Sequence, residues 1–147
     1  MRACCKPSAI FATAFKRLSA LKTKLNPFTE DTLDILELAH SVVDAIEEKQ
    51  GEDIVLLDIQ QLSPHVDYFV VCSGASERQL KAIIDHVVET LQTKHNYRPR
   101  RIEGQAESGW ILLDFIDIVV HAFSTSQRAF YQLEDVWKEA PVVLKMQ

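Results

Sequence analysis

The sequence predicts an α+β domain, in which a mixed sheet of about five strands is flanked by helices. Two kinds of segment alternate along the chain. One kind has apolar residues at every third or fourth position, which is typical of amphipathic helices, and the other is a short, nearly continuous apolar run, which is typical of strands. The predicted order is helix, strand, strand, helix, strand, strand, strand, helix. Strands grouped between helices in this way favour one sheet with helices packed on it.

A single folded domain and a basic extension account for the 147 residues. This length allows one hydrophobic core and is too short for two domains of ordinary size. Residues 1–29 carry six basic side chains and no acid, a charge of +6, whereas residues 30–147 carry 10 basic and 21 acidic side chains, a charge of −11. We therefore expect an N-terminal extension over 1–29, a folded domain over 30–140 and a C-terminal tail over 141–147.

The first half of the domain is predicted to be a helix followed by two strands. Apolar residues recur at helical spacing over 33–46, and Gly51 lies just beyond the end of that helix. A buried strand is expected over 54–59. The run over 68–72 is nearly all apolar and rich in strand-forming residues, so it is predicted to be a central strand covered on both faces.

The second half begins with the most regular helical pattern of the chain. Ser76 precedes Gln79 by three residues, the spacing of a capping box, and strict helical periodicity follows over 80–91. An edge strand is expected near 98–102, because Pro99 is tolerated only at a sheet edge. The remaining elements are a polar loop over 104–109, a hairpin with strands 110–115 and 118–123, and a short last helix over 130–137.

The first hairpin strand has two unlike faces, because side chains alternate along an extended chain. One face is wholly apolar and is predicted to join the core: Ile111, Leu113 and Phe115. The other face carries Trp110, Leu112 and Asp114. An aromatic anchor beside a carboxylate is common at protein interfaces, so this face is a candidate partner-binding patch. The alternative is that Trp110 covers the edge of the core while Asp114 starts the turn.

Catalytic and metal sites find little support in the residues. Asp114 and Asp117 are three apart across a turn, whereas two acids that hold one metal from a single strand lie two apart and face the same way. Ser73-Gly74 lacks the lysine of a phosphate-binding loop. The five histidines form no metal-ligand spacing, and three cysteines without a paired pattern predict no disulfide framework. Cys72 is expected to be a buried, inert thiol.

Three motif groups, in the order and with the gaps found here, resemble one protein family, the ribosomal silencing factor or Iojap family. The resemblance covers roughly residues 32–140, and the three groups are Asp67-Tyr-Phe-Val with Cys72-Ser-Gly, Trp110 with Leu112-Leu113-Asp114 and Val120-His121, and Arg128 with Tyr131, Leu133-Glu134 and Trp137. One position departs from the pattern, because Ile116 stands between Asp114 and Asp117 where the family usually has glycine. A β-branched residue resists the positive φ of a tight turn, so a rearranged or longer hairpin tip is expected.

The resemblance implies a nucleotidyltransferase-like mixed sheet without the catalytic acids, no enzymatic activity, no cofactor and no bound metal. It further implies a partner, ribosomal protein fourteen of the large ribosomal subunit, and repression of translation under nutrient limitation by blocking the joining of the small subunit. The expected partner-binding residues are Trp110, Leu112, Asp114, Phe115, Tyr131 and Glu134. Phe115 is included on the resemblance, with the turn rotating its side chain outward against strand parity.

Other functions and properties stay open at this level. A metal-dependent nucleotidyltransferase using Ser73, Asp114 and Asp117 is one alternative. A general RNA-binding module using Arg98, Arg100 and Arg101 is another, and a minor contact with ribosomal RNA is compatible with either binding function. The resemblance allows a homodimer of the free protein and gives no reason to expect membrane association. A cytoplasmic location is expected, or a mitochondrial or chloroplast location if the basic extension is a presequence.

Overall fold

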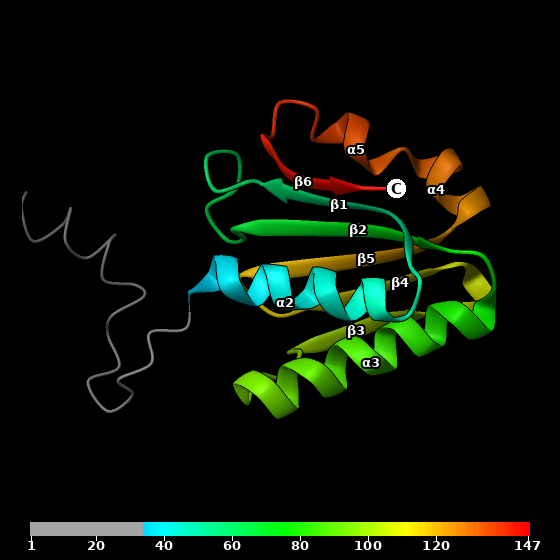
Figure 1. Ribbon diagram of the computed structural model, residues 1–147. Helices are drawn as coiled ribbons and strands as arrows, with labels where there is room; N and C mark the ends of the chain where they lie inside the picture. The colour runs from blue at the N-terminus through cyan, green and yellow to red at the C-terminus, as the bar shows by residue number, and fades with distance from the viewer. Residues whose placement is uncertain (1–33) are drawn as a thin grey trace, which may run out of the picture. The chain divides into compact units, whose positions relative to one another are not determined.

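The computed structural model describes residues 34–147, which contain one six-stranded sheet with helices on both faces (Figure 1). The strand order is β3-β4-β5-β2-β1-β6; β2 and β5 run parallel, and every other neighbouring pair is antiparallel. The predicted α+β fold with a mixed sheet is confirmed. The expected extension over 1–29 lies outside the described residues. Within those residues, no helix has the length and apolar character needed to cross a membrane.

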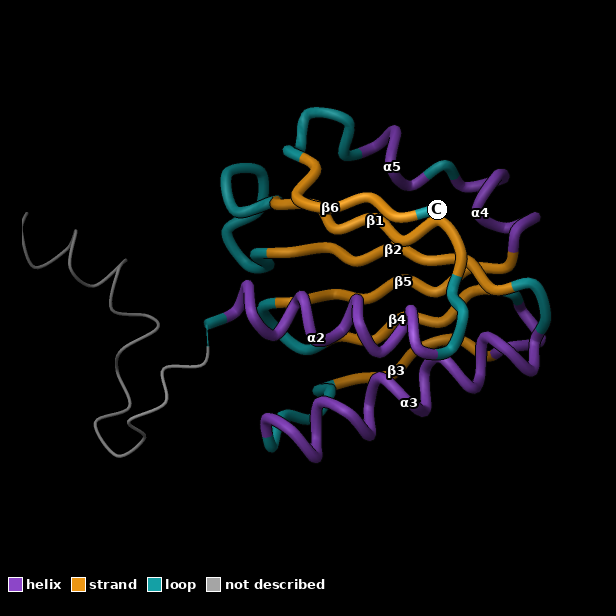
Figure 2. Tube along the Cα trace, in the orientation of Figure 1, coloured by secondary structure: helices purple, strands orange, loops and turns teal. Residues whose placement is uncertain are grey.

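The elements follow the predicted order, with a short 3-10 helix added between β3 and β4 and two further additions near the C-terminus (Figure 2). Their bounds are α2 Ile35–Glu48, β1 Glu52–Asp58, β2 Tyr68–Gly74, α3 Glu77–His95, β3 Arg101–Gln105, η1 Ala106–Ser108, β4 Trp110–Asp114, β5 Ile118–Ser124, α4 Thr125–Tyr131, α5 Leu133–Val136 and β6 Val142–Met146.

The main core lies between the sheet and the two long helices, α2 and α3 (Figure 1). Both helices turn a stripe of apolar side chains toward the sheet, as their sequence periodicity predicts. The start of α3 is fixed by a variant of the predicted capping box: the Ser76 hydroxyl accepts a hydrogen bond from the Gln79 backbone N–H at 3.1 Å, and the Gln79 side chain accepts one at 2.7 Å from the N–H of Ala75, the residue before the cap. Asn96 ends the helix in a left-handed conformation, with φ of 51°.

The opposite face of the sheet has a smaller apolar cluster under the C-terminal segment. Val55, Leu57 and Ile59 pack there with Ala140, and Phe69 meets Trp137 edge to face with ring centroids 5.1 Å apart. Short helices α4 and α5 adjoin this face, and they cover less of it than α2 and α3 cover of the other. The open part of this face lies over β3 and β4, whose side chains are exposed or half-buried there, whereas those of β5 are buried.

Residues 142–146, which were expected to be a tail, form the edge strand β6 and pair with β1. The sheet therefore has six strands and not about five. Apolar and β-branched residues favour a strand here, but the segment is short and gains its stability from pairing with β1, a long-range contact that sequence periodicity does not report.

Two further boundaries differ from expectation. The last helix is broken in two at Gln132, whose φ of 45° ends α4, and α4 itself begins earlier than expected, with Ser124 as its cap. The edge strand β3 begins at Arg101 and not near Arg98, because Pro99 has no N–H to donate to the ladder.

The β4–β5 hairpin has a two-residue tip, as the predicted strand bounds imply, and it is not longer than that. The Phe115 N–H donates to the Ile118 carbonyl at 2.8 Å, so only Ile116 and Asp117 connect the strands. Ile116 has φ of 77° and is half exposed. The Asp117 N–H donates to the Phe115 carbonyl at 3.1 Å, so Ile116 is the central residue of a γ-turn with positive φ, a conformation in which glycine is favoured. The chain therefore keeps a glycine-type turn with a β-branched residue in it, at a cost in backbone strain.

Candidate functional site

The candidate site lies on the open face of strands β3, β4 and β5. Residues directly opposite each other in a sheet have side chains on the same face. The strand register therefore places nine side chains in three rows: Gln105–Trp110–Phe123, Glu103–Leu112–His121 and Arg101–Asp114–Val119. We call these nine residues the Trp110 face.

Exposure rises steadily across the Trp110 face. The β5 members are buried, with Phe123, His121 and Val119 at 0%, 5% and 8% exposure. The β4 members are half-buried, and the β3 members are exposed. The buried β5 members support the half-buried β4 members from one side. Trp110 and Leu112 therefore present apolar surface on a rigid base.

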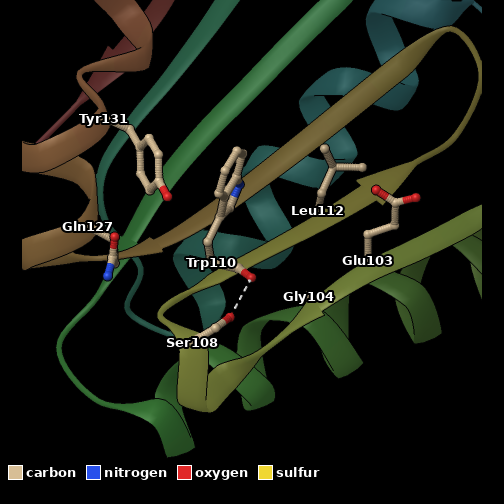
Figure 3. A pocket seen from close by; sticks show the side chains of 7 residues that line it. All are labelled: Glu103, Gly104, Ser108, Trp110, Leu112, Gln127 and Tyr131. Carbon is tan, nitrogen blue, oxygen red and sulfur yellow. Dashed lines mark hydrogen bonds between the residues drawn. The ribbon is translucent and has the colours of Figure 1, made fainter.

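Trp110 is held by contacts on three sides. Its ring stacks on Phe123 at a centroid distance of 5.2 Å and contacts Tyr131 of α4 at 4.8 Å. Its indole N–H donates to His121 Nδ1 at 3.3 Å. Figure 3 shows the indole and the Tyr131 ring side by side above the sheet. Trp110 therefore covers buried Phe123, as the alternative interpretation expected, and also keeps some exposed surface.

His121 is a buried, neutral support for this indole. Burial lowers its pKa to about 4. Since Nδ1 accepts a hydrogen bond from the Trp110 indole N–H, the neutral ring carries its own proton on Nε2. Among residues 34–147, no group accepts a hydrogen bond from that buried Nε2. His121 is thus a core histidine.

Asp114 serves the hairpin turn. Its Oδ1 accepts a hydrogen bond from the Ile116 N–H at 2.8 Å, which stabilises the strained tip. Directly opposite on β3 lies Arg101, whose Nη1 contacts Glu103 Oε1 at 3.1 Å. Opposite charges in facing positions stabilise a strand pair modestly. The exposed part of the Trp110 face thus carries two carboxylates and one guanidinium.

The expected outward rotation of Phe115 is wrong. Phe115 is fully buried, stacks on Tyr97 at 5.8 Å and accepts a hydrogen bond from the Tyr97 hydroxyl at its backbone carbonyl, at 2.7 Å. Strand parity, which assigned Phe115 to the core with Ile111 and Leu113, holds up to the turn. The short tip leaves no room for the chain to twist before the strand reverses.

Glu134 is occupied by an ion pair with Arg128, whose side chain is only 13% exposed. Arg128 Nε donates to Glu134 Oε1 at 2.9 Å, and Nη1 donates to the Ser73 hydroxyl at 2.9 Å and to the Asp53 carbonyl. One guanidinium thereby ties α4 and α5 to strands β1 and β2. Glu134 therefore has a structural role, whereas Tyr131 is 47% exposed beside Trp110.

A cavity of about 310 Å³ opens beside Trp110. Seven residues line it: Glu103, Gly104, Ser108, Trp110, Leu112, Gln127 and Tyr131 (Figure 3). Sequence reasoning found Trp110, Leu112 and Tyr131 but did not assign Glu103 or Gln127 to the site. Parity along β3 would have placed Glu103 beside Leu112 if the register of that edge strand had been known.

The geometry does not assemble the nucleotidyltransferase site that was considered as an alternative. Ser73 and Gly74 lie at the carboxyl end of β2, whereas Asp117 precedes the first residue of the parallel strand β5. Six residues of strand separate the two ends, which is about 20 Å at 3.3 Å per residue. Ser73 also binds Arg128, and the described residues contain no group of three or more His, Cys, Asp or Glu side chains that could hold a metal.

Comparisons with known proteins point to one family. A family model described as "Ribosomal silencing factor during starvation" matches residues 32–147. The Ribosomal silencing factor RsfS of Halalkalibacterium halodurans is 36% identical over 107 residues, which cover 73% of this chain and 91% of that protein. The protein Iojap, chloroplastic, of Zea mays is 30% identical over 112 residues and covers 76% of this chain, which in turn spans 48% of that longer protein.

Solved structures with a similar fold were also found. A crystal structure of a protein from Chromobacterium violaceum superposes with a TM-score of 0.69 at 30% identity, covering 72% of this chain and 88% of that one. A second, from Bacillus halodurans, gives a TM-score of 0.65 at 35% identity, covering 74% and 98%. With the family model matching more than half of the chain, this protein belongs to the ribosomal silencing factor family.

Proposed function

We propose that this protein binds the large ribosomal subunit through ribosomal protein fourteen and sterically blocks joining with the small subunit, which represses translation under nutrient limitation. The family supports a ribosomal role, and one relative, from mouse, is named "Mitochondrial assembly of ribosomal large subunit protein 1". The observation that carries the proposal is the half-exposed Trp110, fixed on three sides on an open sheet face.

A fixed aromatic ring suits this purpose because binding costs it little conformational entropy. Tryptophan and tyrosine are enriched among residues that dominate interface energies, and they act best at the centre of a patch from which water is excluded. Trp110 and Leu112 supply the apolar centre of the proposed contact surface, with Asp114 and Tyr131 at its margin. Phe115 and Glu134 lie outside it, since one is fully buried and the other is held by Arg128.

Charge favours a basic partner. Residues 30–147 carry a balance of −11, and ribosomal proteins that contact RNA are generally basic. Complementary charge speeds the encounter, whereas the aromatic anchor slows dissociation. An interface of about 800 Å² on each partner would be enough for specific binding. The bound domain then acts by occupying volume, so no chemical step is required of it.

The place of action depends on the ribosome that is bound. The relatives include bacterial proteins and proteins named for the mitochondrion and the chloroplast. We propose a cytoplasmic protein of the bacterial kind, with an organelle as the alternative. Sequencing the N-terminus of the mature protein would separate the two, because a presequence within 1–29 would have been removed.

The test is co-sedimentation with purified large subunits, combined with a subunit-joining assay. Replacing Trp110 with alanine should weaken binding by about 2 kcal/mol or more, which is about 30-fold in the dissociation constant. Leu112→Ala should weaken binding less, and Ile102→Ala is its matched control, because Ile102 is an exposed apolar residue on the other face of the same strand pair. A folded Trp110→Ala protein that binds and inhibits normally would contradict the proposed surface.

A further inference from the structure

The cavity beside Trp110 combines an apolar wall with a carboxylate at one end. Trp110 and Leu112 form the wall on β4, and Tyr131 closes the side nearest α4 (Figure 3). Glu103 stands opposite Leu112 in the strand register, and its side chain is 55% exposed. No lysine or arginine lines the cavity. Its volume is at the lower limit for ligand pockets, about 300 Å³, so it is suited to a single side chain.

Glycine lets β3 approach β4 closely at this wall of the cavity. Gly104 has φ of 84°, and a Cβ atom at this position would lie 2.1 Å from the Trp110 carbonyl oxygen. Any other residue at this position would therefore clash with the β4 backbone. The Ser108 hydroxyl, which also lines the cavity, donates to the Gln105 carbonyl at 2.7 Å and so fixes the connection between β3 and β4.

These walls match the chemistry of a long basic side chain. Lysine and arginine lay an apolar stem along apolar surface and keep the charged head in a polar environment. Their heads are attracted to the faces of tryptophan and tyrosine rings. A carboxylate at the far end supplies the charge-assisted hydrogen bond that such a head requires. A purely apolar side chain would instead desolvate Glu103 without compensating it.

Glu103 is available for this role. In the free protein it contacts only Arg101 among the described charged groups, and both side chains are more than half exposed. An ion pair of this kind contributes little to stability, so an incoming cation can share or replace Arg101 at small cost. The surplus of acids in residues 30–147 also favours an incoming cation.

We propose that the cavity formed by Glu103, Trp110, Leu112 and Tyr131 is a specificity pocket for one long basic side chain, an arginine or a lysine, of the protein partner. This inference rests on the proposed function and names the chemistry of its contact. Trp110 and Leu112 hold the stem, and the Glu103 carboxylate accepts hydrogen bonds from the cationic head.

The experiment measures association and dissociation rates of large subunits on immobilised full-length protein. Glu103→Gln keeps the size of the side chain and removes its charge, so we expect dissociation to become about tenfold faster, because a cation held in a pocket affects mainly the dissociation rate. Glu103→Leu should accelerate dissociation at least as much. The matched control is Glu89→Gln, which changes net charge equally at an exposed position on α3, and which should alter only the association rate.

The outcomes separate this inference from the proposed function. If Trp110→Ala weakens binding while Glu103→Gln behaves like Glu89→Gln, the Trp110 face is the binding surface and the pocket does not take a cation. Tighter binding by Glu103→Leu would also overturn the inference, because it would identify an apolar occupant. If neither Trp110→Ala nor Glu103→Gln changes any rate, the proposed surface fails together with the pocket.

Discussion

Acidification should destabilise this protein through His121. The imidazole is 5% exposed, packs edge to face against Phe69 at 5.2 Å and accepts a hydrogen bond from the Trp110 indole N–H, and within residues 34–147 no carboxylate is paired with it to stabilise a positive charge. Protonation would place a charge in this aromatic cluster and would also remove the acceptor for Trp110. The perturbations that test this are a decrease in pH and the substitution His121→Phe.

The expected loss in the free energy of unfolding follows from the pKa of His121. Burial lowers the pKa of His121 from an ordinary 6.5 to about 4. Between these values the unfolded chain binds a proton that the folded protein does not, so the free energy of unfolding falls as pH falls through this range. Each pKa unit corresponds to about 1.36 kcal/mol. The full loss between pH 6.5 and pH 4 is therefore about 3 kcal/mol, a large fraction of the stability of a domain of this size.

The assay is urea unfolding at about pH 7, 5.5 and 4.5 for the wild type and for His121→Phe, with the slope of the transition checked for constancy. Phenylalanine keeps an aromatic ring against Phe69 and Phe123 but does not titrate. Glu48, whose pKa is lowered by its hydrogen bond to His86, adds acid sensitivity to both proteins and cancels in the difference. At pH 7 the variant should be as stable as the wild type or about 1 kcal/mol more stable, because a buried unpaired donor is removed.

The reasoning is refuted if both proteins lose stability in parallel as the pH falls. It is also refuted if His121→Phe costs more than about 2 kcal/mol at neutral pH, because the Trp110 hydrogen bond would then outweigh the unpaired Nε2.

Three further predictions concern stability and reactivity. Ile116→Gly should raise the free energy of unfolding by about 1 kcal/mol in chemical denaturation, because it relieves the positive φ, whereas Ile116→Ala should give little gain. Arg128→Met should lower the free energy of unfolding by about 2 kcal/mol or more, because it leaves Glu134 unpaired. The control Arg101→Met, at the exposed ion pair with Glu103, should change the free energy of unfolding by less than about 0.5 kcal/mol. Equal effects of the two substitutions would contradict the role of Arg128. Burial raises the pKa of Cys72 to about 12, so peptide mapping should find it alkylated by iodoacetamide only after denaturation, and modification of the native protein would contradict its burial.

Local patterns in the sequence predicted most of the fold because they record burial directly. The periodicity of residues 80–91 reflects one apolar face of α3, and the capping box at Ser76 fixes its start. Strand parity correctly divided residues 110–115 between the core and the open face, including Phe115. The resemblance assigned Phe115 to the partner surface, and there the physical rule was the better guide.

The same patterns could not find features that depend on partners distant in sequence. β6 was missed because its stability comes from pairing with β1, about 90 residues earlier in the chain. Glu134 was expected to face the partner, yet Arg128 binds it and at the same time reaches the Asp53 carbonyl and the Ser73 hydroxyl. No local signal connects these three segments.

The sequence by itself determined the order of the helices and strands up to β5, the two faces of β4 and the acidic character of the folded part, because alternation, periodicity and charge are properties of neighbouring residues. Tertiary structure alone decided that Trp110 rests on Phe123 between Tyr131 and His121, that a cavity opens toward Glu103, and that the acids near the hairpin tip lie at the opposite end of β2 from Ser73. The physical reason is that strand register and helix docking set these contacts, and both are fixed by packing across the whole sheet.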